Sequence, residues 1–113
     1  MKNFVQNGRQ LSVTAPAAVA AGAGVLVGSL FGVAVHAAAS GDPVEIVTEG
    51  VFSLAKVGSQ AWTVGVRIYW DDSAKNCTTT ASTNKLIGVA AAAVGSGAGE
   101  TLGQVRLSAA FTL

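Results

Sequence analysis

Short apolar and polar runs alternate along the whole chain, and most have the length of a β-strand rather than a helix. Leu11–Ala15 alternates apolar and polar residues strictly, which is typical of a strand with one buried face. Glycine, Asp, Asn and Ser separate the runs, as they do at the turns of small β proteins. The pattern predicts further strands in these ranges: Gly24–Gly28, Leu30–His36, Val44–Leu54, Val66–Trp70, Cys77–Thr80, Lys85–Ala93 and one or two within Leu102–Leu113.

Several local signals add detail to these strands. Gly41-Asp42-Pro43 predicts a turn, because Pro fixes φ and Asp can bond to its own backbone. Val44–Leu54 is the longest extended stretch, and its apolar phase changes at Gly50, where we expect a β-bulge. Ser59–Val64 is expected to form one short helical turn around Trp62. The loop 71–76 is expected to close a hairpin between the strands on either side of it.

We therefore predict an all-β fold, a small β-sandwich or β-barrel with short strands and an extended N-terminal arm. The expected organisation is an arm over residues 1–10 and a single β-rich domain over residues 11–113. No stretch predicts a long helix, since Ala90–Ala93 is too short to nucleate one. The expected core residues are apolar and lie within these strands: Val33, Val35, Ile46, Phe52, Leu54, Ile68, Trp70, Ile87, Val89, Val105 and Leu107.

The chain also contains an internal echo. Leu30–Ala34, followed by Ala37, Ser40, Gly41 and Val44–Ile46, resembles Leu86–Ala90, followed by Ala93, Ser96, Gly97 and Val105–Leu107. Two copies of one strand-loop-strand unit would produce this pattern. Coincidence in a chain rich in Ala, Gly and Val would produce it equally well.

Charge is scarce in this sequence. Of its 113 residues, 50% are hydrophobic and only 12% are charged, with a net charge of +1, against roughly 25% charged residues in an ordinary soluble domain. The balance excludes the basic surface that a nucleic-acid-binding protein needs. A weakly charged surface of small residues is typical of a chain that other protein chains cover, so we expect a homo-oligomer or a component of a larger assembly.

An alternative is a small membrane-spanning protein, because residues 15–39 contain no Lys, Arg, Asp or Glu. Gly24, Gly28 and Gly32 even have the spacing of packed transmembrane helices. Pro16 and the glycines are unfavourable in a helix, however, and no cationic cluster flanks the segment. We therefore expect no contact with a membrane.

Candidate chemistry is sparse. Gly95–Gly99 lacks the lysine of a phosphate-binding loop, because Glu100 follows it. Asp71 and Asp72 are expected to form a hairpin turn rather than a calcium loop, and Cys77 is expected to be a small packing residue. His36 is the only base available to a nucleophile. We therefore expect no catalytic residues, no cofactor and no metal, and we predict that the protein is not an enzyme.

Three of the seven aromatic residues, Trp62, Tyr69 and Trp70, lie close together in the sequence. Trp and Tyr dominate interface hot spots, and Trp62 is the better candidate for an interface, whereas core packing suits Trp70 equally well. If the three rings shared one face, they could also stack on sugars, so a carbohydrate-binding β-module is a further alternative.

The order of segments along the whole chain points to one family. Met-Lys-Asn-Phe-Val-Gln begins the chain, and Leu-Ser-Val-Thr-Ala-Pro-Ala follows. Next come Gly-Val-Leu-Val-Gly-Ser-Leu-Phe-Gly-Val-Ala, Val-Thr-Glu-Gly-Val-Phe-Ser-Leu-Ala-Lys and Ile-Tyr-Trp-Asp-Asp, and finally Leu-Ile-Gly-Val-Ala and Val-Arg-Leu. This series resembles the cement, or decoration, proteins of tailed-bacteriophage capsids. Some relatives carry a recombinase label, but this chain has no phosphate-binding Gly-Lys-Ser/Thr motif, so we exclude that activity.

The resemblance implies a structural protein of the virion that binds the outer surface of the phage head and bridges major capsid proteins. It also implies self-association, with a homotrimer favoured and a dimer as the alternative. From the extended polar-apolar pattern of residues 1–10, we also expect this arm to reach a capsid subunit and add a strand to an exposed sheet edge. The expected interface residues, toward the capsid or toward another copy, are Met1, Lys2, Asn3, Phe4, Val5 and Trp62.

Overall fold

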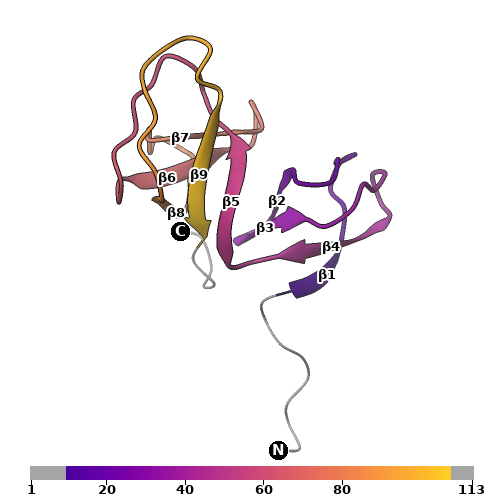
Figure 1. The fold of residues 1–113 in the computed structure, drawn as a ribbon. Coiled ribbons are helices and arrows are strands. Elements are labelled where there is room, and N and C mark those ends of the chain that lie inside the picture. Colours follow the sequence, from indigo (N-terminus) through magenta and orange to yellow (C-terminus); the bar gives the residue numbers. More distant parts are fainter. Residues whose placement is uncertain (1–9, 108–113) are drawn as a thin grey trace, which may run out of the picture.

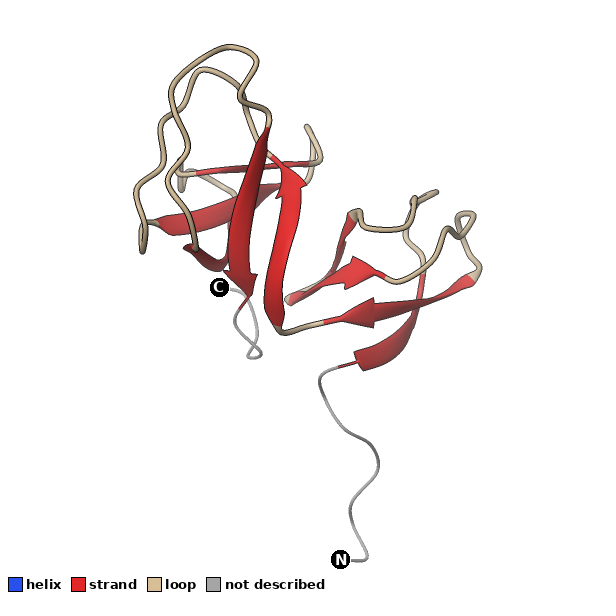
Figure 2. Cartoon of the chain, viewed as in Figure 1, coloured by secondary structure: helices blue, strands red, loops and turns tan. Residues whose placement is uncertain are grey.

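The computed structural model describes residues 10–107, which form nine β-strands and no helix (Figures 1 and 2). The all-β prediction is therefore confirmed. The helical turn expected at Ser59–Val64 is wrong, because Trp62 instead forms an isolated antiparallel bridge with Val94. The strands are β1 (Gln10–Thr14), β2 (Gly24–Val27), β3 (Leu30–Ala34), β4 (Pro43–Val47), β5 (Gly50–Ala55), β6 (Arg67–Asp71), β7 (Asn76–Thr78), β8 (Lys85–Ala90) and β9 (Leu102–Leu107).

The strands form two antiparallel sheets. The smaller sheet has four strands in the order β1-β4-β3-β2, and the larger has five in the order β5-β9-β8-β6-β7. The apolar segment 15–39 contributes β2, β3 and their loops to the smaller sheet. Within residues 10–107, no helix has the length and apolar character that crossing a membrane would require.

The connection between the sheets lies at Thr48 and Glu49. The sequence predicted one extended stretch with a bulge at Gly50, but the structure ends β4 at Val47 and begins β5 at Gly50 in the other sheet. Gly50 has a φ of 120°, a conformation that residues with a Cβ rarely adopt. The change of apolar phase at this glycine therefore marks a corner between sheets.

The larger sheet curves until its two edge strands approach each other. Lys56, next to the end of β5, forms a parallel bridge with Cys77 of β7, and the Val57 amide donates to the Cys77 carbonyl at 3.0 Å. These contacts partly close the sheet into a barrel, which Figure 1 shows as the cluster of β5 to β9. Closure at one end covers part of the β5 edge, which would otherwise expose unpaired backbone groups.

Two apolar clusters fill the molecule. The larger lies inside the barrel and also takes Phe31 and Val33 from the smaller sheet, with the Phe31 and Trp70 rings 5.1 Å apart. The second cluster lies on the opposite face of the smaller sheet and includes Val44 and Ile46. The core residues that the sequence predicted correctly, all buried, are Val33, Ile46, Leu54, Ile68, Trp70, Ile87, Val105 and Leu107.

Three predicted core residues differ from expectation. Phe52 and Val89 are only half-buried, and Val35 is 49% exposed. Val35 follows the end of β3, where its amide still donates to the Glu45 carbonyl at 2.9 Å while the chain leaves the sheet. The sequence predicted a strand as far as His36, two residues beyond the observed end of β3 at Ala34, and Val35 was therefore assigned to the core incorrectly.

The internal echo in the sequence corresponds to a structural repeat. Strands β1, β2, β3 and β4 pair in the order β1-β4-β3-β2, and β5, β6, β8 and β9 pair in the equivalent order β5-β9-β8-β6, with β7 added at the end. Gly22 and Gly65 precede β2 and β6 with φ values of 84° and 89°. The same connectivity and the same turn conformation therefore occur twice.

Backbone hydrogen bonds repeat with the same register. The Gly22 amide donates to Ala34, as the Gly65 amide donates to Ala90, both at 2.8 Å. Four further bonds of the first half have an equivalent in the second half. Written as donor amide to acceptor carbonyl, with the equivalent bond in parentheses, they are Ala34 to Ala23 (Ala90 to Val66), Val35 to Glu45 (Ala91 to Gln104), Val19 to Ala38 (Trp62 to Val94) and Ala38 to Val19 (Val94 to Trp62). In this register Ile46 of β4 corresponds to Val105 of β9, because Ile46 pairs with Ala34 and Val105 pairs with Ala90. The sequence comparison had aligned Ile46 with Leu107, so the structural match differs from it by two residues.

Candidate interaction surfaces

The residues expected at an interface fall into two groups. Met1, Lys2, Asn3, Phe4 and Val5 lie outside the residues that the structure describes. Trp62 lies in the core and is only 1% exposed.

Trp62 is fixed by contacts on several sides. Its Nε1 donates to Gln60 Oε1 at 3.0 Å, and the same oxygen accepts the Thr79 amide at 2.8 Å. The Lys56 ammonium lies 5.5 Å from the centre of the ring, and Gly103 packs so closely that a Cβ there would overlap the ring. The expectation that Trp62 offers its ring to a partner is therefore corrected. Gln60, a polar neighbour in the sequence, thus accepts the indole N–H and does not indicate that the ring is exposed.

The other two clustered aromatic residues do not form an exposed face with Trp62. Trp70 is buried against Phe31, and Tyr69 is half-buried. Sugar-binding modules stack their ligands on ring faces that solvent can reach, so these three residues do not favour carbohydrate binding.

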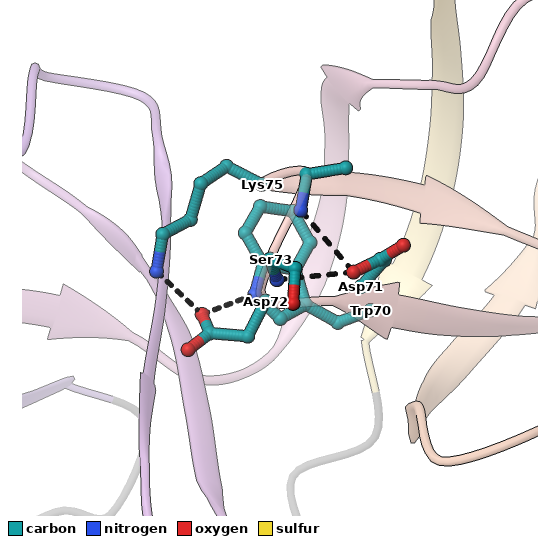
Figure 3. A network of polar contacts seen from close by, with 6 residues as sticks. Trp70, Asp71, Asp72, Ser73 and Lys75 are labelled. Atoms are coloured by element: carbon teal, nitrogen blue, oxygen red, sulfur yellow. Dashed lines mark hydrogen bonds and ion pairs between the residues drawn. The ribbon is translucent and has the colours of Figure 1, made fainter.

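Asp71 and Asp72 organise the hairpin loop between β6 and β7 (Figure 3). Asp71 Oδ1 accepts the amides of Ser73 at 3.0 Å and Ala74 at 3.2 Å. Asp72 Oδ1 accepts Trp70 Nε1 at 3.0 Å and Lys75 Nζ at 2.8 Å. The carboxylates thus hold the turn and orient a core indole, as expected for a hairpin. No group of carboxylate, His or Cys side chains within residues 10–107 has the arrangement of a metal site.

The pKa of Asp72 reflects these contacts. Partial burial alone would raise it, but the hydrogen bonds from Lys75 and Trp70, together with the charge of Lys75, outweigh burial and lower the pKa. The carboxylate is therefore ionised at neutral pH.

Cys77 and His36 are not arranged for catalysis. Cys77 is fully buried, and burial raises the pKa of its thiol to about 12, so the thiolate is scarce at neutral pH. His36 is exposed at the end of the smaller sheet, where its Nε2 accepts the Glu45 amide at 3.3 Å. No hydrogen bond joins the side chains of Cys77 and His36.

One end of the smaller sheet is a weakly charged surface of small residues. The loops 16–23 and 35–42 are held together by reciprocal backbone bonds between Val19 and Ala38 at 2.9 and 3.0 Å. Of these loop residues, only Asp42 carries a formal charge. The exposed alanine, proline and valine residues of the two loops are Pro16, Ala18, Ala20, Ala21, Val35, Ala37 and Ala39.

The barrel also exposes large apolar side chains. Val51 is 54% exposed, Val64 is 69% exposed and Leu102 is 65% exposed. The sequence analysis did not identify these residues as candidates for contact. A signal was present in β9, where alternation places Leu102 on the same outward face as Gln104 and Arg106.

A polar hollow of about 560 Å³ lies beside the hairpin loop. Hydroxyl and amide side chains form much of its lining, including Thr78, Thr80, Ser82 and Asn84. Within residues 10–107, the molecule therefore combines a weakly charged sheet end, exposed apolar groups on the barrel and no assembled catalytic centre.

Comparison with known proteins identifies the family of this fold. No curated protein and no solved structure matches the chain significantly. A family model described as phage cement protein matches residues 5–107, which include every strand of both sheets. Because that match covers most of the sequence, the chain belongs to the phage cement protein family.

Proposed function

We propose that the protein binds the outer surface of a tailed-phage head and stabilises it by bridging neighbouring major capsid proteins. Membership of the family gives the chain a structural role in the phage capsid. The match to residues 5–107 carries the proposal, because it spans all nine strands found in the described residues 10–107 rather than a short motif.

The character of the surface supports this role. Packaged DNA pushes outward on the shell, so a clamp across the boundary between capsid subunits raises the force needed to separate them. Broad contacts of this kind use close-packed, weakly charged surfaces. The loops 16–23 and 35–42, in which Asp42 is the one formally charged residue, and the exposed Val51, Val64 and Leu102 provide such surfaces.

Self-association strengthens a clamp without requiring strong single contacts. A symmetric oligomer engages several capsid subunits at once, so each further contact forms at a high effective concentration. We expect the protein to act as a homo-oligomer, a trimer or a dimer, on the head.

The test is to mix purified protein with expanded heads that lack it. Occupancy is counted by electron microscopy, and head stability is measured as release of DNA on heating. The proposal predicts ordered density on the outer surface and a higher release temperature. Absence of density on the outer surface, with no change in release, would overturn it.

The N-terminal arm is the part that we expect to reach a partner. A chain lacking Met1 to Val5 should remain folded, because the described strands begin at Gln10, but should no longer decorate heads. Circular dichroism checks the fold, and head occupancy measures binding. Unchanged occupancy would refute the role of the arm.

A further inference from the structure

Strand β7 has no counterpart in the first half of the repeat among residues 10–107. In the larger sheet, β7 pairs with the outer side of β6, and the segment after β5 holds it from the other side. There the Val57 amide donates to the Cys77 carbonyl at 3.0 Å. Gln60 Nε2 also donates to Thr78 Oγ1 at 3.1 Å. In the smaller sheet the strand equivalent to β6 is β2, and β2 is an edge strand.

The segment that follows β1 is equivalent to the segment that follows β5. The Ala15 amide donates to the Asp42 carbonyl at 2.8 Å. In the second half, the Lys56 amide donates to the Thr101 carbonyl, also at 2.8 Å. The segment after Ala15 and strand β2 therefore correspond to the segment after Lys56 and strand β6, which together hold β7. The residue after Ala15 is Pro16, which has no amide to donate, so backbone bonds to a strand in this place of the smaller half would come from β2.

A cavity of about 240 Å³ lies at this place in the smaller half. Residues 16–20 form one side of it, and β2 forms another. The barrel contributes Leu54 and Trp70. The charged residues of the lining are Asp72 and Lys75, which are bonded to each other at 2.8 Å. The cavity therefore suits an extended segment that turns an apolar side chain inward.

The free edge of β2 offers backbone donors and acceptors to such a segment. The Ala34 amide donates to the Ala23 carbonyl at 2.9 Å. Bonded and non-bonded pairs alternate along an antiparallel ladder, so Val25 is the next residue of β2 that bonds to β3. The amides and carbonyls of Gly24 and Leu26 therefore point away from β3, and no backbone group within residues 10–107 bonds to them. Both residues line the cavity, so a segment placed there can pair with β2 as a new strand.

The N-terminal arm contains a sequence that resembles β7. Lys2–Val5 and Lys75–Thr78 both begin with Lys-Asn. Phe4 then stands in the place of Cys77, and a β-branched residue follows in both segments. Cys77 is fully buried in the larger half. Phe4 in the equivalent place would put a large apolar side chain into the cavity.

The arm of the same molecule is poorly placed to reach this cavity. The described part of β1 begins at Gln10, and β2 lies at the opposite edge of the sheet, three strand spacings or about 14 Å away. The five residue steps from Val5 to Gln10 span at most about 18 Å. Both faces of the sheet are packed, one through Phe31 and Val33 against the barrel and the other in the second apolar cluster. The direct path is therefore blocked, whereas the arm of a second copy has no such limit.

We propose that Lys2–Val5 of one copy inserts between β2 and residues 16–20 of a second copy, as an added strand of its smaller sheet with Phe4 in the cavity. This inference rests on the self-association in the proposed function and names its interface. It makes a second copy, rather than the capsid subunit expected from the sequence, the partner of the arm. The arm leaves at the β1 edge and enters at the β2 edge, so the contact is head-to-tail, and repetition around an axis closes a ring.

A disulfide between two copies tests the placement directly. A copy carrying Phe4→Cys is mixed with a copy carrying Ala18→Cys in oxidised glutathione, since Ala18 is exposed and lines the cavity. We expect a covalent dimer of the two variants on non-reducing electrophoresis. Its yield should exceed that with Ala37→Cys by about tenfold or more, because docking raises the effective concentration of the paired thiols. Ala37 is the matched control, an exposed alanine of the neighbouring loop that does not line the cavity, and the buried Cys77 does not compete.

Two substitutions test the contact without a cross-link. Phe4→Asp brings a charge to the apolar cavity, and Ala18→Trp fills the cavity. Each should weaken association by about tenfold or more in light scattering after size-exclusion chromatography, because the Phe4 ring is no longer buried. Asn7→Asp adds the same charge to the arm outside the inserted segment, and Ala37→Trp adds the same ring outside the cavity, so both should leave association unchanged. Circular dichroism must show that each variant is folded.

The outcomes separate this interface from the proposed function. Selective trapping of Phe4→Cys by Ala18→Cys, with weaker association of Phe4→Asp and Ala18→Trp, supports the interface whether or not heads are bound. A monomeric wild type, equal trapping by Ala37→Cys, or unchanged association of Phe4→Asp overturns it. A monomer that carries both cysteines and closes a disulfide within one chain also overturns it.

Head binding gives the remaining distinction. Unchanged association of Phe4→Asp with loss of head binding overturns the interface, because the arm would then hold the capsid protein. Selective trapping by a wild-type-like oligomer that never binds heads would instead contradict the proposed function and support the interface between copies.

Discussion

Replacing Trp62 by Ala tests whether this residue supports the fold or an interface. Truncation of a fully buried large aromatic side chain costs about 3–5 kcal/mol in the free energy of unfolding. The lost hydrogen bond to Gln60 adds no more than about 1 kcal/mol, because Gln60 Oε1 keeps the Thr79 amide as a donor. A domain of this size has a total of about 5–15 kcal/mol, so the variant should lose a large part of its stability.

Urea unfolding followed by far-ultraviolet circular dichroism measures this difference. Trp62→Phe keeps most of the ring volume and should cost clearly less than Trp62→Ala. Val64→Ala, at a side chain that is 69% exposed, should change the free energy of unfolding by no more than about 0.5 kcal/mol. A loss below about 1 kcal/mol for Trp62→Ala, with a simultaneous loss of self-association or head binding, would refute the assignment of this ring to the core.

Three further predictions concern the buried Cys77, the closely packed Gly24 and the hydrogen-bonded Asp72. Burial and a pKa of about 12 should keep Cys77 unreactive toward a thiol reagent at about pH 8 in the folded protein. In denaturant the same thiol should react fully, and rapid labelling of the folded protein would contradict this prediction. Gly24→Ala should cost about 1–3 kcal/mol, since its Cβ would stand 2.7 Å from the Trp70 ring, whereas Gly99→Ala, with open space around it, should be nearly neutral in the same urea titration. Because the pKa of Asp72 is lowered in the folded state, its carboxylate stabilises the fold above the unfolded-state pKa of about 4, and this contribution is lost as the pH falls through the lower folded-state pKa. Asp72→Asn should therefore be less stable than the wild type at neutral pH, and the difference in stability should shrink in acid. A difference in stability that does not depend on pH would count against this assignment.

The alternation of apolar and polar residues predicted strands such as β4, β6 and β9, because each of these has one buried face. Ile68 and Trp70 of β6, and Val105 and Leu107 of β9, follow this rule and were assigned correctly to the core. Alternation says nothing about which sheet a strand joins. The corner at Gly50 was therefore interpreted as a bulge, since both produce the same change of phase along the chain.

Trp62 could not be placed from its neighbours in the sequence. Its burial depends on Gly103, Gln60 and Lys56, of which Gly103 lies on a strand 41 positions away. The juxtaposition of Arg67 and Arg106 was hidden for the same reason, because both residues pair with Val89 of β8. The interface expected at Met1 to Val5 remains a prediction, since those residues lie outside the described structure.

The position of Phe31 and Val33 has a consequence for how the molecule melts. Both residues belong to strand β3 of the smaller sheet, yet their side chains pack in the apolar cluster of the barrel. Loss of either half on heating removes apolar partners from the other half, so neither can open at low cost while its neighbour stays intact. The duplicated halves are therefore expected to unfold together in a single transition, although each has its own set of hydrogen-bonded strands.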